Sequence, residues 1–275
     1  MSTEYEFLGI DEGKQNLFRG DTGSGKIHWT KSLSSYPTAR ALQRLDEGRV
    51  LMGYEKGYCV VDIKTGDIVH DCPRWDNISS AFRDEEGYTL LTGTDLEGMI
   101  GVCVITLDQN DRIVHKAVQK GDYVRLMTVM DRNAYMLSTN DHITLCDREL
   151  NTLNSFSAEG FLHAWQSRKM SDGALLVSAG YGAFMAKFTA EGKLLETFGR
   201  AGDLPPEIQP YFYAAFDFTD QGHILLANWQ GHGPDNGHKG RQLLLFDSDG
   251  KYLDSWSFPD EISSFQGLLI LDQRY

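Results

Sequence analysis

The segment VDIKTGDIVH at residues 61–70 joins two short apolar runs through a tight polar turn, and five variants of it recur along the chain. Their turn residues, with that of the quoted copy, are Gly25, Gly66, Asp111, Asn151, Gly192 and Gly250. Successive turns lie 41, 45, 40, 41 and 58 residues apart. Strand-like units that repeat with a period in the forties are typical of a β-propeller, in which four-stranded blades surround an axis.

A second turn alternates with the first, so each repeat divides into four short strands that we call A to D. The quoted segment joins strands C and D, and the second turn joins A and B at residues 46–48, 85–87, 131–133, 171–173 and 220–222. Gly and Asn in these turns tolerate the positive φ that tight hairpins require. Many B and C strands are apolar at every position, as expected of strands covered on both faces by neighbouring sheets.

The two ends of the chain complete the count of blades. The N-terminal residues supply strands B, C and D of a repeat without its strand A, and residues 263–272 supply a lone strand A. Pairing this last strand with the first three seals sheet edges that would otherwise stay open. We therefore predict an all-β, six-bladed β-propeller with four antiparallel strands per blade, closed by the C-terminal strand A and spanning residues 1–275 as one domain.

The charge of the chain narrows the class of partner. The 275 residues include 39 acidic and 26 basic side chains, a net charge of −13, whereas nucleic acids and anionic membranes are bound by clustered Lys and Arg. No apolar run approaches the ~20 residues that span a bilayer. The four cysteines form no C-x-x-C motif, and the N-terminal residues lack the pattern of a signal peptide. We expect a soluble, monomeric, cytoplasmic protein whose partner is a small molecule, not nucleic acid or membrane.

The repeat also resembles a known sequence pattern. Asp21, Gly25 and Trp29 match the D-x-x-T-G-x-x-x-W repeat of quinoprotein-type (PQQ-like) β-propellers, and the second copy keeps the Asp, Thr and Gly with His70 in place of the tryptophan. The resemblance implies a propeller. The PQQ cofactor is not carried over, because only Trp29 occupies the position of the docking tryptophans. The segment ANWQGHGPDNGHKG, residues 227–240, is similar to loops of uncharacterised six-bladed propeller proteins.

Long loops gather on one face of the predicted disc. Up-and-down alternation places the A–B and C–D turns on one face and the B–C and D–A connections on the other, and the long connections all belong to the second group. The two longest, residues 199–211 and 228–241, belong to the same blade and should be neighbours in space. Binding residues on a rigid scaffold tend to lie in such loops, so we expect this face to be the functional one.

The A strands begin on this face, so their first residues should surround the mouth of the central channel. When the A strands are aligned on the A–B turn, two positions that lie two residues apart should point to the same side of each strand. The first is occupied, in chain order, by Thr38, Asn77, Tyr123, His163, Phe212 and Ser264, and the second by Arg40, Ser79, Arg125, Trp165, Ala214 and Gln266. Charged side chains are rarely buried unless they are paired or bind a ligand. The two arginines therefore either bind an anion or pair with acids such as Asp76 as structural staples.

The side chains of this ring suit a small polar ligand. Arg40 and Arg125 can bind a carboxylate through paired hydrogen bonds. The aromatic residues can stack on a sugar ring or another flat ligand, and His163 can act as a general base or a metal ligand. The predicted ligand-binding set is Arg40, Tyr123, Arg125, His163, Trp165, Tyr213, Trp229 and Gln266, with His163 as the candidate catalytic residue.

The glycine-rich loop at residues 228–241 adds a candidate metal site. His232 and His238 could coordinate a divalent metal with a third His or a carboxylate, or they are incidental residues of a solvated loop. The sequence indicates no other cofactor. Three functions stay open: binding of a small polar ligand such as a carbohydrate or an acidic sugar, a metal-dependent lyase or hydrolase acting on a carbohydrate at the same mouth, and a protein-interaction scaffold.

Overall fold

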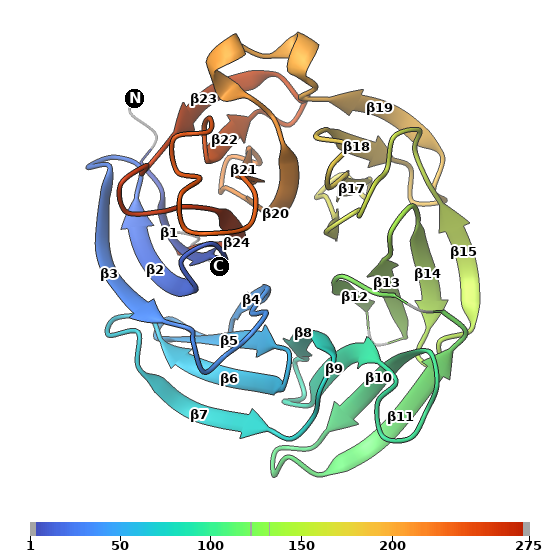
Figure 1. The fold of residues 1–275 in the computed structure, drawn as a ribbon. Coiled ribbons are helices and arrows are strands. Elements are labelled where there is room, and N and C mark those ends of the chain that lie inside the picture. Colours follow the sequence, from blue (N-terminus) through green and yellow to red (C-terminus); the bar gives the residue numbers. More distant parts are fainter. Residues whose placement is uncertain (1–3, 122, 132, 272–275) are drawn as a thin grey trace.

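The computed structural model is a ring of β-sheets around a central axis (Figure 1), and it describes residues 4–121, 123–131 and 133–271. Within these residues, twenty-four strands form six sheets of four antiparallel strands each. The predicted six-bladed β-propeller is therefore confirmed. The end of the predicted closing strand, from residue 272 onward, lies outside the described residues.

Five blades are built from four consecutive strands each, with the first strand at the channel and the last at the outer edge. Blade 2 contains β4 (Ala41–Arg44), β5 (Arg49–Tyr54), β6 (Gly57–Asp62) and β7 (Ile68–Pro73). Blade 3 contains β8 (Ile78–Arg83), β9 (Thr89–Thr94), β10 (Val102–Leu107) and β11 (Ile113–Gln119). Blade 4 contains β12 (Met127–Asp131), β13 (Ala134–Ser138), β14 (Ile143–Asp147) and β15 (Thr152–Phe156). Blade 5 contains β16 (Ser167–Lys169), β17 (Leu175–Ser178), β18 (Met185–Phe188) and β19 (Leu194–Phe198). Blade 6 contains β20 (Phe212–Phe218), β21 (Ile224–Trp229), β22 (Leu243–Phe246) and β23 (Tyr252–Trp256).

Blade 1 joins the two ends of the chain. Its strands, from the channel outward, are β24 (Phe265–Ile270), β1 (Glu6–Asp11), β2 (Asn16–Asp21) and β3 (Lys26–Ser32). Strand β24 pairs with β1 in antiparallel register, with Phe7 opposite Ile270. The predicted closure of the ring by the C-terminal strand A is therefore confirmed.

Two buried carboxylates hold the closing strand near its two ends. Asp11 accepts hydrogen bonds from the backbone N–H groups of Ser263 and Ser264, both at 2.9 Å. Asp217 of blade 6 accepts one from the N–H of Ile270, also at 2.9 Å. An unpaired backbone N–H is costly to bury, so each carboxylate stabilises the position of β24 by satisfying donors that would otherwise lack a partner.

Burial follows the position of a strand in its blade. All six residues of the middle strand β10 are buried, whereas the outer strand β3 alternates between exposed and partly buried residues. Neighbouring blades cover both faces of the middle strands, which explains why their sequences are apolar at every position. The core is therefore a series of apolar layers between adjacent blades.

The position four residues after the recurring turn contacts the next blade. The indole Nε1 of Trp29 donates to the carbonyl oxygen of Ile63 at 3.2 Å. His70 occupies the same position one repeat later, and its Nε2 lies 3.1 Å from a carboxylate oxygen of Asp111. The histidine that replaces tryptophan in the repeat therefore keeps the docking role and changes the chemistry of the contact.

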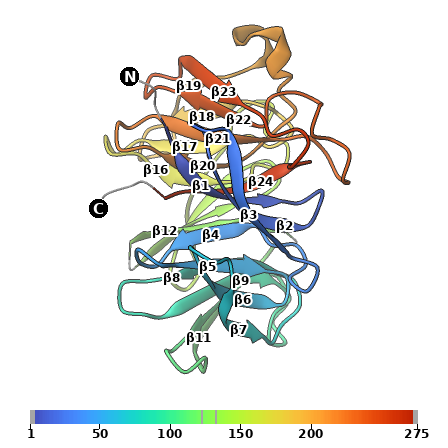
Figure 2. The ribbon, with the colours of Figure 1, turned by 90° about the vertical axis from the view of Figure 1, so that its left-hand side faces the viewer.

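The long connections lie together on one face of the disc. In Figure 2 the orange-red loop between β21 and β22 extends from this face. The other long connection of blade 6 contains two 3₁₀ helices, η1 (Ala201–Asp203) and η2 (Pro206–Ile208). The backbone N–H of Arg241 donates to the carbonyl oxygen of Ile208 at 3.0 Å, so the two longest insertions are neighbours, as predicted. Among the described residues, no helix is long and apolar enough to cross a membrane.

Candidate functional site

The channel mouth on the long-loop face brings together five of the predicted residues. We use the term mouth for Arg40, Tyr123, Arg125, His163 and Trp165. They precede the first strands of blades 2, 4 and 5, so they approach the axis from three directions.

His163 reaches the mouth because the chain turns sharply at this residue. Its φ of 58° lies in the left-handed region, as do the values of 56° at Thr38 and 65° at Asn77, the equivalent positions of two other blades. Gly180, with a φ of 62°, packs so closely against this turn that a Cβ would lie 2.1 Å from the carbonyl oxygen of His163. Only glycine fits this contact, which also positions the neighbouring Tyr181.

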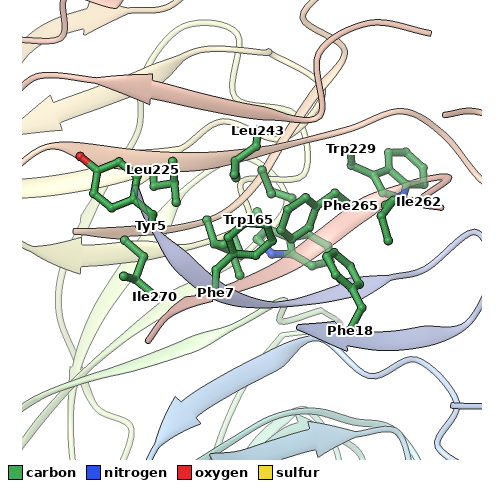
Figure 3. Close-up of a cluster of buried hydrophobic side chains, with 14 of the residues drawn as sticks. Tyr5, Phe7, Phe18, Trp165, Leu225, Trp229, Leu243, Ile262, Phe265 and Ile270 are labelled. Carbon is green, nitrogen blue, oxygen red and sulfur yellow. The ribbon is translucent and has the colours of Figure 1, made fainter. Parts of the chain in front are cut away.

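Trp165 forms the floor of the mouth. Its side chain is buried in the cluster shown in Figure 3 and packs edge-on against Phe212, with the ring centroids 5.5 Å apart. The guanidinium carbons of Arg40 and Arg125 lie 5.8 Å and 5.4 Å from the centroid of its ring. Cations are attracted to the face of an indole ring. Trp165 therefore supports the two guanidinium groups, and its face is not open for the predicted stacking on a ligand.

The two arginines lack a carboxylate partner. Within the described residues, no Asp or Glu oxygen lies within 4.0 Å of either guanidinium group. Asp76, the acid suggested as a structural partner, instead pairs with Lys56 at 3.1 Å. The staple hypothesis is therefore wrong for Asp76, which pairs with Lys56 and with neither arginine.

The electrostatic environment disfavours the charged form of both arginines. Burial lowers the pKa of Arg40, and the more distant carboxylates of Glu55 and Glu12 offset this effect in part. Burial and the positive charge of Arg40 together lower the pKa of Arg125 to about 10. Because a guanidinium group stays protonated in proteins, the mouth holds two cations that repel one another without a counter-ion in contact.

Four buried polar atoms at the mouth have no hydrogen-bond partner among the described residues. They are Nε of Arg40, the hydroxyl oxygen of Tyr123, Nε of Arg125 and Nε1 of Trp165. All four carry a hydrogen, and the three nitrogens can only donate. Buried polar groups in proteins are nearly always paired, so this cluster marks a site with a surplus of donors.

His163 is held as a neutral imidazole. Nη2 of Arg125 lies 2.7 Å from Nδ1 of His163, and since arginine can only donate, Nδ1 accepts and the ring proton is on Nε2. Burial and the charge of Arg125 lower the pKa of His163. With the Nδ1 lone pair occupied, His163 can offer its Nε2 proton to a ligand; it is poorly placed to act as a base.

An aromatic collar, which we define as Tyr181, Tyr211 and Trp229, extends outward from His163. The ring centroids are 5.6 Å apart for His163 and Tyr181, 5.9 Å for Tyr181 and Tyr211, and 6.0 Å for Tyr211 and Trp229. Trp229 is buried, whereas Tyr181 and Tyr211 are 37% and 48% exposed. Neither tyrosine was predicted, because both lie in connections between strands, where the alternation that defines the predicted ring gives no side-chain direction.

Glu12 is a further residue that the sequence analysis missed. Its two carboxylate oxygens accept hydrogen bonds from Nε1 of Trp229 at 3.2 Å and contact Nδ1 of His232 at 2.9 Å. Glu12 lies in the B–C hairpin of blade 1, on the face where such hairpins were expected to project. It therefore fixes the outer end of the collar from the other end of the chain.

Two predicted ligand-binding residues, Tyr213 and Gln266, belong neither to the mouth nor to the aromatic collar. Tyr213 is fully buried between blades, and its hydroxyl donates to the carbonyl oxygen of Gly199 at 2.6 Å. Its prediction as a stacking residue is not supported, because strand alternation turns it away from the channel. Gln266, on β24, is 8% exposed and lies close to the axis.

The two histidines of the candidate metal site have separate partners. His232 pairs with Glu12, whereas Nε2 of His238 lies 3.5 Å from a carboxylate of Asp260. The described part of the chain contains no group of three His, Cys, Asp or Glu side chains placed to hold a metal ion. The arrangement thus does not supply the third ligand that the metal hypothesis requires.

Two cavities lie below the mouth. One of about 280 Å³ is the central channel, lined by the A strands of all six blades, with Arg40 in its wall. A larger one, of about 1150 Å³, lies on the opposite face among the A–B turns of blades 2 to 4. In the larger cavity, Arg49 pairs with Asp46 and Arg83 donates to Thr89, and the lining also includes the acidic residues Asp84, Glu85 and Asp131. The unpaired cations therefore distinguish the mouth as the better candidate site.

The fold and the mouth define the class of protein: the chain is a six-bladed β-propeller with a cationic channel mouth on its long-loop face. No protein-family model matches the sequence, and no curated protein matches it either.

Solved structures share the fold at low sequence identity. A protein of unknown function from Bacteroides caccae has a TM-score of 0.82 and 16% identity, over 98% of this chain and 100% of that chain. A streptogramin B lyase has a TM-score of 0.61 and 15% identity, over 97% and 88%. A catalytically inactive histidine-to-alanine variant of virginiamycin B lyase from Staphylococcus aureus, with quinupristin, has a TM-score of 0.62 and 13% identity, over 97% and 92%. These likenesses show the propeller fold; the resemblance to quinoprotein-type repeats stays a prediction.

Proposed function

We propose that this propeller binds a small ligand carrying a carboxylate at the channel mouth, with the anion held by Arg40 and Arg125. The single observation that carries the proposal is the cluster of unpaired donors around two guanidinium groups that lack a counter-ion. A carboxylate has only acceptors when ionised, so it complements this cluster. The proposed partner is therefore a small molecule, bound by a monomeric protein.

The charge distribution supports the same proposal. The chain has a net charge of −13, yet its channel mouth presents two cations. A carboxylate beside Arg125 would add an attraction that offsets the repulsion from Arg40. A hydrogen bond to a charged group contributes about 1.5–3 kcal/mol. Loss of one guanidinium group should therefore weaken binding by about 10- to 150-fold.

The test is a thermal-shift and calorimetric screen of carboxylates on the full chain and on Arg40→Met and Arg125→Met. Arg112→Met, an exposed arginine on the opposite face, is the matched control. We expect the two mouth variants to lose the ligand response while their ligand-free stability stays the same or rises, because each removes a desolvated, unpaired charge. If the variants bind as well as the control does, the mouth is not the anion site.

A second candidate function is a lyase at the same mouth. Two of the proteins that share the fold are lyases, and His163, whose Nε2 proton is available to a ligand, lies beside the Arg125 cation at the mouth. Incubation with quinupristin, followed by chromatography, tests this candidate. Conversion that His163→Ala abolishes would support it, and unchanged quinupristin would count against a lyase of that specificity.

The scaffold hypothesis is less favoured, because the mouth concentrates unpaired charge at a narrow point.

A further inference from the structure

Resting on the proposed anion site, we propose that the ligand is an aromatic carboxylate, a flat unsaturated ring bearing a carboxylate, and not an acidic sugar. The aromatic collar carries this inference. It begins next to the cations, since Tyr181 packs against His163 and His163 is hydrogen-bonded to Arg125. A ligand whose carboxylate meets the arginines would therefore project its body along the collar.

The surface that this body would meet is apolar and aromatic. Tyr181 and Tyr211 are 37% and 48% exposed, and Leu162, beside His163, is 54% exposed. Large apolar side chains with this much exposure, gathered at one opening, are typical of binding sites. The collar rings already meet one another edge to face or at a tilt, with centroid separations near 6 Å. An additional ring can join this arrangement through the same edge and face contacts.

Three side-chain amides of the neighbouring loop and its flanking strands already donate within the protein. The side-chain amides of Asn228, Asn236 and Gln242 donate to backbone carbonyl oxygens at 2.8 Å, 2.9 Å and 2.7 Å. The indole N–H of Trp229 donates to Glu12. Sites that recognise hydroxyl groups hold free polar groups in position, and the N–H groups of these three amides are not free. The collar thus offers faces and edges of rings where a sugar needs hydrogen bonds.

Contacts within the protein hold the collar residues in place. Trp229 is fixed by Glu12 through a hydrogen bond of 3.2 Å, and Tyr211 is held by its backbone N–H, which donates to Asn228 at 3.0 Å. Gly180 fixes the hairpin that carries Tyr181. A preorganised aromatic surface loses little conformational entropy when a flat ring binds to it.

The experiment compares three carboxylates by calorimetry on the full chain: phenylacetate, cyclohexylacetate and glucuronate. The first two share size and charge and differ in the aromaticity of the ring, so a surface that is merely apolar would bind cyclohexylacetate at least as well. We expect phenylacetate to bind about three- to tenfold more tightly than cyclohexylacetate, the range of one aromatic pair. Glucuronate should bind more weakly still.

Two variants locate the preference. Tyr211→Leu should bring the affinities for phenylacetate and cyclohexylacetate together while binding still depends on Arg125. Tyr88→Leu, a partly buried tyrosine at the large cavity of the opposite face, is the matched control and should leave the preference unchanged.

The outcomes separate this inference from the proposed function. Glucuronate binding as tightly as phenylacetate, or a phenylacetate preference that survives in Tyr211→Leu, would overturn the aromatic ligand and leave the anion site standing. Absence of binding for all three carboxylates would overturn both. Loss of binding in Tyr88→Leu would place the ligand on the opposite face and refute both as well.

Discussion

Replacing Asp11 with alanine should destabilise the ring, because this carboxylate holds the closing strand. It is fully buried and accepts backbone N–H groups of Ser263 and Ser264 at 2.9 Å and of Lys14 at 3.2 Å. In Asp11→Ala the two serine N–H groups lose their acceptor inside the protein. A buried donor without a partner costs about 1–3 kcal/mol, so the two cost about 2–6 kcal/mol. Removing a desolvated charge offsets part of this cost, and we expect a loss of about 2–4 kcal/mol in unfolding free energy.

Urea unfolding followed by tryptophan fluorescence measures this loss. The unfolding free energy falls by about 1–3 kcal/mol per M of urea, so the unfolding midpoint should fall by about 1 M. Asp249→Ala is the matched control, since Asp249 is exposed and its carboxylate accepts no hydrogen bond within the described residues. It should stay within about 0.5 kcal/mol of the parent protein. Equal midpoints for the two variants would refute the role assigned to Asp11 in closing the ring.

Four further outcomes are expected. Deleting residues 263–275, which removes β24, should leave an unfolded or aggregated chain, and a cooperative melt in circular dichroism would contradict this. Gly180→Ala should lower the unfolding free energy by about 1–3 kcal/mol and abolish carboxylate binding, because its Cβ would meet a carbonyl oxygen at 2.1 Å. Tyr213→Phe should lose about 1 kcal/mol in urea unfolding and keep full ligand affinity, since its hydroxyl bonds only backbone. The pKa of His163 is lowered from 6.5 on folding, so its contribution to stability is present above pH 6.5 and is lost as the pH falls through the folded-state pKa. Urea unfolding at pH 7 and pH 5 should show a larger acid-induced loss in the parent protein than in His163→Gln, and equal losses would refute this linkage.

The architecture could be predicted from sequence because it depends on local patterns that repeat. Each copy of the recurring turn marks a C–D hairpin, so six copies indicate six blades. This holds although Gly66 is the only one of the six turn residues that follows a threonine. Closure followed from counting strands, since three strands at the start and one at the end make a complete blade. The docking contact of His70 with the next blade needed the structure, because the sequence shows the position and not the partner.

Only those site residues whose direction follows from strand alternation could be predicted from the sequence. Period two placed Arg40, Arg125 and His163 at the mouth, and the same rule should have excluded Tyr213, which occupies the alternate, core-facing position. Tyr181 and Glu12 lie in B–C hairpins, where the direction of a side chain depends on loop conformation and not on a period. The alternative that the arginines pair with acids such as Asp76 failed for the same reason, since Asp76 lies in the connection between β7 and β8.

A crystal structure of the protein with phenylacetate would test whether the channel mouth binds an aromatic carboxylate. We expect density at the channel mouth, with the carboxylate within hydrogen-bond distance of Arg40 and Arg125 and the ring against Tyr181 and Tyr211. Density in the cavity among the A–B turns of blades 2 to 4, with the mouth free of ligand, would contradict it.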